Sequence, residues 1–170
     1  MGNIFANTLA EDITQTIVTG SHSDSVPDGS DINDNDSGNA ANLALADVEE
    51  IGLLGSDFCI KQAKTSTIIG ERINDNLVNL NFDMLGSPNY VFEIYDGQII
   101  TNSTFANTIP NNNKVTSLLC DWLNSQKIPW NNITLGSSSD YASFLAADDP
   151  YCIPNVAQDP CYHKSYDMKR

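Results

Sequence analysis

Histidine and aspartate residues gather between residues 17 and 38 of this 170-residue chain. His22 and Asp24 directly follow the β-branched run Ile17-Val18-Thr19, which predicts a buried strand. Asp34 comes later, in a loop crowded with oxygen-bearing side chains. A histidine just past a strand can bind a metal ion through one ring nitrogen while a neighbouring group orients the other nitrogen. Asp34 can approach the same ion from the opposite side, so the spacing indicates a metal site.

The acidic loop around Asp34 has two other interpretations. Runs of Asn and Asp are common in solvated turns, where their side chains hydrogen-bond to the local backbone. An EF-hand calcium loop that begins at Asp31 needs Gly at its sixth position and Glu at its twelfth. Asp36 and Asn42 stand at those positions, which excludes the calcium loop. The solvated turn remains open.

Three later strings carry residue types suited to the same chemistry. The pair Glu49-Glu50 precedes the apolar run IGLLGS, Asp83 lies within NLNFDMLGSPNY, and His163 ends the string DPCYH. Each has an ordinary interpretation when taken alone: a helix N-terminus, a turn after a strand and a solvated histidine. Their combination in one chain is more specific than any single string.

The order of these strings resembles that of the zinc aminopeptidases of the M28 metallopeptidase family, and the resemblance extends from Asn3 to Asp167. It implies two zinc ions held by five ligands: Asp34 bridging both ions, His22 and Asp83 at one ion, and Glu50 and His163 at the other. The implied function is a metal-dependent aminopeptidase that hydrolyses N-terminal peptide bonds. Its substrates would be the N-termini of peptides or proteins.

The same resemblance implies catalytic and substrate-binding residues. Glu49 would be the general base that moves a proton from the attacking water to the leaving amine. Tyr162 would donate a hydrogen bond to the tetrahedral intermediate. Asp140, in the string LGSSSDY, matches a family aspartate near the substrate, with a helix N-cap as the alternative interpretation. The acidic candidates for binding the free amine of the substrate are Glu49, Asp83 and Asp140.

The connection that leads to the glutamate pair departs from the family pattern. Family members place a further strand there, but only two residues separate a helix expected over 39–46 from Glu49. A crossover back into a parallel sheet needs a dozen or more residues. One continuous helix over residues 39–54, about 24 Å long, is therefore an alternative. Such a helix would carry Glu50 away from Asp34.

Two further departures keep other functions open. Ser138 stands where the family commonly has an arginine that stabilises the charged oxygen of the reaction, and the segment 150–159 is short. One alternative is therefore a catalytically impaired or inactive remnant of an M28 peptidase that acts, if at all, by binding. A second is an enzyme of the same fold that cyclises amino-termini instead of cleaving peptide bonds.

The resemblance implies an α/β fold, a mixed and mainly parallel β-sheet flanked by helices, in one truncated domain over residues 1–170. Residue patterns predict these further elements: strands over 3–8, 77–82 and 91–95, a turn at Asp96-Gly97, and helices over 56–64 and from residue 111 onward. An apolar stripe on the last helix is expected in the core; it consists of Val115, Leu118, Leu119, Trp122 and Leu123.

Composition excludes several classes of partner. The chain has 22 acidic and 8 basic residues and a formal net charge of −14. Nucleic acids and anionic membrane surfaces normally require a basic patch, so neither is expected as a partner. The sequence contains no apolar stretch long enough to predict a transmembrane helix. The sequence does not indicate an oligomeric state.

The resemblance also implies a secreted glycoprotein, although no signal peptide is visible at the N-terminus. Sequons for N-glycosylation begin at Asn35, Asn102 and Asn132. Cys152 and Cys161 are close enough in sequence to close a small loop, and their pairing stays open.

Overall fold

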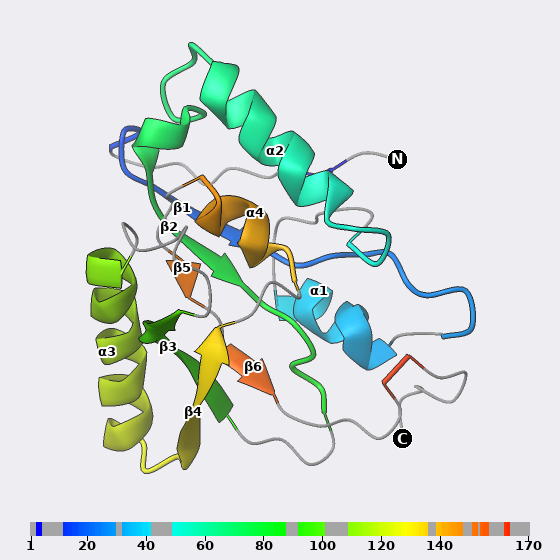
Figure 1. The fold of residues 1–170 in the computed structure, drawn as a ribbon, viewed down its shortest axis with the longest axis vertical. Coiled ribbons are helices and arrows are strands. Elements are labelled where there is room, and N and C mark those ends of the chain that lie inside the picture. The colour runs from blue at the N-terminus through cyan, green and yellow to red at the C-terminus, as the bar shows by residue number, and fades with distance from the viewer. Residues whose placement is uncertain are drawn as a thin grey trace.

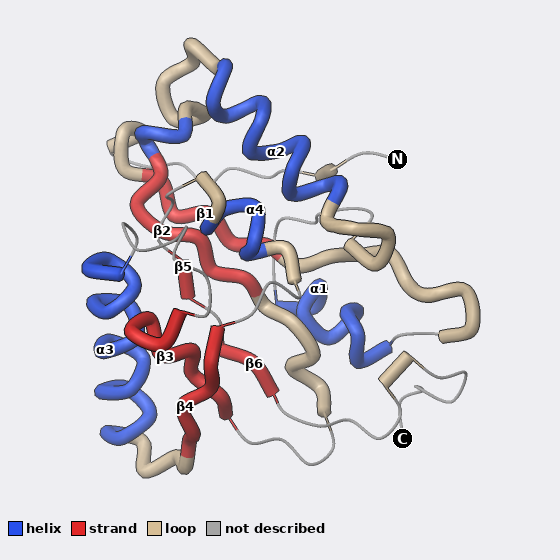
Figure 2. The backbone as a smooth tube through the Cα atoms, in the orientation of Figure 1, coloured by secondary structure: helices blue, strands red, loops and turns tan. Residues whose placement is uncertain are grey.

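Two three-stranded sheets organise the chain (Figure 1). The computed structural model describes residues 3–4, 12–29, 32–41, 49–87, 92–100, 109–135, 139–147, 151–152, 154–156 and 162–163. Among these residues, no helix is both long enough and apolar enough to span a bilayer. Figure 2 shows the strands at the centre of the molecule and the helices around them.

The first sheet has the order β1-β2-β5 and is entirely parallel. Its strands are β1 (Thr16–Gly20), β2 (Asn76–Asn81) and β5 (Tyr151–Cys152). The β-branched residues of β1 favour an extended backbone. Because Gly20 pairs with Asn81, the carboxyl ends of β1 and β2 lie at the same edge of the sheet. This edge is where open α/β sheets bind their ligands.

The second sheet has the order β4-β3-β6, with β3 (Phe92–Ile100), β4 (Trp130–Leu135) and β6 (Pro154–Val156). β3 runs parallel to β4 and antiparallel to β6. The described sheets are thus mixed and mainly parallel, as predicted. The predicted turn at Asp96-Gly97 is wrong, because both residues lie inside β3. Between Asp96 and Ile100 the pairing with β4 changes register, so the turn-forming residues produce an irregularity within the strand.

The helices confirm two predictions and leave one partly outside the described residues. The helical segments are η1 (Ile32–Asp36), α1 (Ser37–Ala41), α2 (Leu54–Thr65), η2 (Ile73–Asp75), α3 (Ile109–Ser125) and α4 (Tyr141–Leu145). α2 and α3 occupy the predicted positions. Of the helix predicted over 39–46, the structure describes only the part within α1, and residues 42–48 lie outside the described residues. Of the predicted strand 3–8, only Asn3 and Ile4 are described.

The core lies between α2, α4 and the strands. α2 packs against α4, and α4 packs against β2 (Figure 1). Within the part of the chain that the structure describes, the buried apolar residues are Ile60, Ile94, Leu123, Tyr141, Phe144 and Leu145.

The predicted core stripe of α3 is only partly correct. Leu123 is buried, whereas Leu118 is 70% and Trp122 is 55% exposed. α3 packs against β3 and β5, and a helix that packs on one side leaves the residues at the margin of its apolar stripe in contact with solvent.

Candidate metal centre

The pairing of β1 with β2 brings His22 and Asp83 together. Gly20 of β1 pairs with Asn81 of β2. His22 stands two positions after Gly20, and Asp83 stands two positions after Asn81. The backbone N–H of Phe82 donates to the carbonyl of Gly20 at 2.9 Å, which extends the contact towards the site. His22 Nε2 consequently lies 3.7 Å from Asp83 Oδ1.

Asp34 approaches this pair from the turn η1. Its Oδ1 lies 3.0 Å from His22 Nε2, and its Oδ2 lies 3.2 Å from His163 Nε2. Asp34 is 3% exposed, and its neighbours Asn33 and Asn35 are also buried. The solvated-turn interpretation of this loop is therefore wrong, because its central residues are turned inward.

Two asparagines, for which the sequence suggested no structural role, hold this turn in place. Asn35 donates from Nδ2 to the carbonyl of Phe82 at 2.8 Å, and its Oδ1 accepts from the backbone N–H of Gly38 at 3.0 Å. Asn33 donates from Nδ2 to the hydroxyl of Ser87 at 2.9 Å. Because these bonds tie the turn to the end of β2, they fix Asp34 relative to Asp83.

The glutamate pair reaches the site from a turn. The carbonyl of Glu49 accepts hydrogen bonds from the backbone N–H groups of Gly52 and Leu53 at 2.9 and 3.0 Å. Gly52 and Leu53 have φ angles of 109° and 61°, and α2 begins only after them. The alternative of one continuous helix over 39–54 is therefore wrong, since this left-handed turn interrupts it. Glu50 Oε2 lies 3.3 Å from His163 Nε2, so Glu50 is not carried away from the site.

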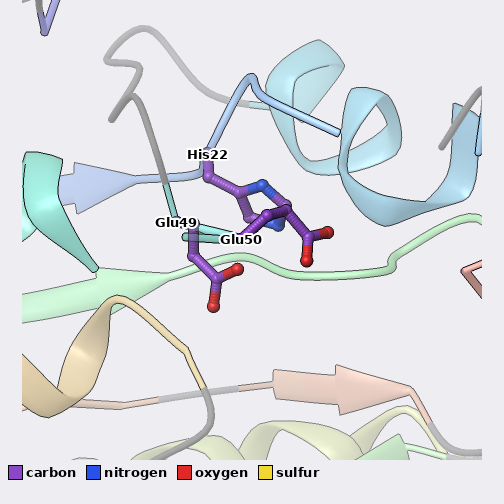
Figure 3. A group of neighbouring side chains, drawn as sticks. All are labelled: His22, Glu49 and Glu50. Atoms are coloured by element: carbon purple, nitrogen blue, oxygen red, sulfur yellow. The ribbon is translucent and has the colours of Figure 1, made fainter. Parts of the chain in front are cut away.

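Figure 3 shows His22 just after β1, with the side chain of Glu50 next to its ring and Glu49 beside them. Ligand atoms of His22, Glu49 and Glu50 lie within 4.8 Å of one another. Two further groups meet the same limit: His22 with Asp34 and Asp83, and Asp34 with Glu50 and His163. The five residues expected as zinc ligands are thus brought together, and Asp34 belongs to both of the groups expected from the sequence.

Tyr162 contacts a member of these groups, whereas Asp140 belongs to none of them. The ring of Tyr162 stacks on that of His163 with centroids 3.7 Å apart, and 46% of Tyr162 is exposed. Asp140 is 4% exposed and stands at the N-cap of α4 without making a side-chain cap hydrogen bond. Burial raises the pKa of Asp140 to about 6. Asp140 therefore lacks the side-chain hydrogen bond that an N-cap would make. It also belongs to none of the three groups of possible metal ligands.

The electrostatics of the site favour a cation. Burial lowers the pKa of His22, but the carboxylates of Asp34 and Asp83 outweigh burial and raise that pKa to about 12. Burial, reinforced by neighbouring carboxylates, raises the pKa of Glu49 to about 8. Positive charge is therefore stabilised at the centre of the group, and a divalent cation would supply it.

Unpartnered atoms in the same place fit a metal ion. Asp83 Oδ1 and His163 Nε2 are buried, and neither makes a hydrogen bond. The two carboxylate oxygens nearest His163 Nε2 lie at 3.2 and 3.3 Å, but without hydrogen-bond geometry. A shared cation satisfies such donor atoms, and imidazole with carboxylate is a donor set that zinc accepts. The residues present therefore fit zinc.

Two residues behind the expected ligands complete the arrangement. Ser139 donates from its hydroxyl to Asp83 Oδ2 at 2.7 Å and accepts from Asn81 Nδ2 at 2.9 Å. The backbone carbonyl of Asp24 lies 3.3 Å from His22 Nδ1, as expected for a group that orients the second ring nitrogen. Ser139 was not singled out from the sequence, because a serine beside Asp140 has no distinctive pattern of its own.

Comparison with known sequences identifies the family. The sequence model of peptidase family M28 matches residues 42–169. Leucine aminopeptidase 2 of Trichophyton rubrum is 32% identical over 166 residues, which cover 87% of this chain and 32% of that protein. A probable leucine aminopeptidase 2 of Aspergillus fumigatus is 32% identical over 161 residues, or 84% of this chain and 30% of that protein. The chain spans about a third of the length of these relatives.

Solved structures show the same fold. BSAP, a zinc aminopeptidase from Bacillus subtilis, aligns with a TM-score of 0.69 at 20% identity, covering 95% of this chain and 42% of that one. LapA aminopeptidase of Legionella pneumophila aligns with a TM-score of 0.74 at 19% identity, covering 94% of this chain and 46% of that one. A glutaminyl cyclase of Bacteroides thetaiotaomicron aligns with a TM-score of 0.58 at 17% identity, covering 89% of this chain and 65% of that one. With its α/β fold and a family match over more than half of its length, the chain belongs to peptidase family M28.

Proposed function

We propose that this chain is a metal-dependent aminopeptidase domain that hydrolyses N-terminal peptide bonds with a pair of zinc ions. The observation that carries the proposal is the position of Asp34. One of its carboxylate oxygens lies 3.0 Å from His22 Nε2, and the other lies 3.2 Å from His163 Nε2. A carboxylate that faces two separate imidazoles suits the bridge of a two-metal site. The leucine aminopeptidases among its relatives support a peptide substrate.

The residues divide the chemistry between them. A bound zinc pair supplies Lewis acidity to polarise the scissile carbonyl and to acidify water. Glu49 takes a proton from the attacking water and returns it to the leaving amine, and its place within 4.8 Å of His22 and Glu50 suits that role. Tyr162 donates a hydrogen bond to the oxygen of the tetrahedral intermediate, and its partly exposed ring rests on His163. The acidic residues available for the free amine of the substrate are Glu49, Asp83 and Asp140.

Zinc content and turnover test the proposal together. We expect about two zinc ions per chain after dialysis against metal-free buffer, measured by elemental analysis, and loss of both in Asp34→Ala. Glu49→Ala should retain the zinc and lose turnover of a leucine amide substrate by about 100-fold or more. Unchanged turnover in Glu49→Ala would exclude Glu49 as the base. Less than one zinc in the wild-type chain would exclude the two-metal site.

One observation from the sequence favours the catalytically impaired remnant as a second candidate. Ser138 stands where the resemblance to the family implies an arginine that stabilises the charged oxygen of the reaction. The same measurements separate the two candidates. Two bound zinc ions without turnover of any aminoacyl amide would identify a binding protein derived from the family.

We also propose one incomplete peptidase domain over residues 1–170 and passage through a secretory pathway. Asn132 is exposed on β4, whereas Asn35 is 2% exposed and donates a hydrogen bond to the carbonyl of Phe82. Asn102 lies outside the described residues, as do the side chains of Cys152 and Cys161. Secretory expression followed by glycosidase treatment should reduce the mass of the wild-type chain, and Asn132→Gln should remove the mass contributed by that site.

A further inference from the structure

The carboxylate of Asp24 bonds to the backbone of both residues of the glutamate pair. Its Oδ1 accepts from the N–H of Glu49 at 2.8 Å, and its Oδ2 accepts from the N–H of Glu50 at 3.1 Å. These bonds connect residues 25 and 26 positions apart in the sequence. Two successive amides on one carboxylate fix both the position and the direction of the peptide, and ionised acceptors make the stronger hydrogen bonds.

The turn that carries the glutamate pair also has hydrogen bonds of its own. Its internal hydrogen bonds run from Gly52 and Leu53 to the carbonyl of Glu49, so they shape the turn without attaching it to the sheet. The Asp24 carboxylate makes that attachment, because Asp24 closely follows β1 in the chain. The side chain is largely buried, with 17% of its surface exposed, which limits competition from water.

His22 has a separate partner in the same residue. His22 Nδ1 lies 3.3 Å from the backbone carbonyl of Asp24 and 3.5 Å from its Oδ1. The backbone carbonyl stays in place when the side chain is changed. The carboxylate therefore makes its shorter contacts, at 2.8 and 3.1 Å, with the backbone of the glutamate pair and a longer one, at 3.5 Å, with the imidazole.

We infer that Asp24 is a positioning residue that acts through the backbone of Glu49 and Glu50. It sets Glu50 for the group formed with Asp34 and His163, and it sets Glu49 for its role as base. The group formed by His22, Asp34 and Asp83 depends on it much less. The metal-binding part of this inference rests on the proposed function, and the backbone attachment does not.

Amide hydrogen exchange of the metal-free protein tests the attachment alone. The Glu49 and Glu50 amides should be protected in the wild type and should exchange about tenfold faster or more in Asp24→Asn and Asp24→Ala. Asp24→Asn keeps the shape and one acceptor oxygen, so at least one of the two amides should lose protection. Asp28→Asn is the matched control, since it removes the same charge from an exposed position of the same loop. Unprotected amides in the wild type would overturn the inference.

Zinc titration in single-site backgrounds tests which group depends on Asp24. In His22→Ala only the group of Asp34, Glu50 and His163 remains, and adding Asp24→Ala should weaken zinc binding by about 10- to 100-fold. In His163→Ala both groups that contain His22 remain. Because His22, Asp34 and Asp83 can bind zinc without the glutamate pair, adding Asp24→Ala should have a much smaller effect there. An equal loss in both backgrounds, or a larger loss in His163→Ala, would mean that Asp24 acts through His22 and would overturn the inference.

The failure of the proposed function has a different signature. A wild-type chain that binds no zinc but protects the Glu49 and Glu50 amides would refute the two-metal site and leave the backbone attachment standing. A chain that binds two zinc ions with the same affinities in the wild type and in Asp24→Ala would refute the positioning role while leaving the proposed function standing.

Discussion

Asp34 illustrates which single residues can be recognised from sequence. His22, Asp34, Glu50, Asp83 and His163 were found because histidines and carboxylates in a fixed order form an uncommon pattern. Asn35 belongs to the same loop string, but its role depends on a bond to the carbonyl of Phe82, 47 residues away. Backbone carbonyls carry no mark in the sequence. The residues expected as zinc ligands could therefore be recognised in the sequence, and the residues that hold them in place could not.

Asp75 gives a pH-dependent prediction at this scale. Bonds from Arg72 and from the backbone N–H of Gly70 lower the pKa of Asp75 from 3.8 to about 2. Because the pKa is lower in the folded chain, Asp75 stabilises it above about pH 4, and this contribution is lost as the pH falls towards 2. D75N should therefore be less stable than wild type at pH 6, and the difference in unfolding free energy should shrink towards pH 2. A difference independent of pH, measured by urea unfolding, would contradict this assignment.

At the scale of elements, regular segments followed the sequence more closely than their connections. α2 and α3 have the helical spacing from which they were predicted. The turn at Asp96-Gly97 did not form, because the pairing of β3 with β4, which includes Asp96 and Ile100, outweighs a local turn preference. The continuous helix over 39–54 failed for the opposite reason, since a local left-handed turn at Gly52 and Leu53 interrupts it.

The packing of α1 against the end of β2 leads to a second prediction. A Cβ atom on Gly38 would lie 2.5 Å from the carbonyl oxygen of Phe82 and would also clash with the side chain of Asn35. Gly38→Ala should therefore lower the free energy of unfolding by about 1–3 kcal/mol. Gly20→Ala is the matched control, because a Cβ atom there has no neighbour within 4 Å. Equal stability of the two variants in chemical denaturation would show that α1 does not pack as described.

At the scale of the whole molecule, negative charge is concentrated where the metal site is proposed. The chain carries a formal net charge of −14, and several of its carboxylates are gathered at one buried site. The order of the motifs was sufficient to predict the family and the α/β fold. The division of the described strands into two sheets was not predicted, because strand pairing between distant segments leaves little trace in a single sequence.

Zinc should accordingly stabilise the entire folded chain. Each occupied site adds about 2.7 kcal/mol when free zinc is 100-fold above its dissociation constant. We expect chelation to lower the melting temperature and zinc to restore it, as measured by calorimetry. In Asp34→Ala, zinc should produce little or no shift. A zinc-dependent rise in the melting temperature of Asp34→Ala equal to that of wild type would place the binding elsewhere.

The pairing of Gly20 with Asn81 has a consequence for how this site tolerates change. His22 and Asp83 meet because each stands two positions beyond a paired residue. Side chains alternate between the two faces of a sheet, so a shift of one residue reverses the face to which each side chain points. Inserting or deleting a single residue in β1 or β2 would thus turn His22 or Asp83 away from the site. Both residues would still be present in the sequence. For this protein, the number of residues between the paired strands and His22 or Asp83 matters to the site as much as the identity of its histidines.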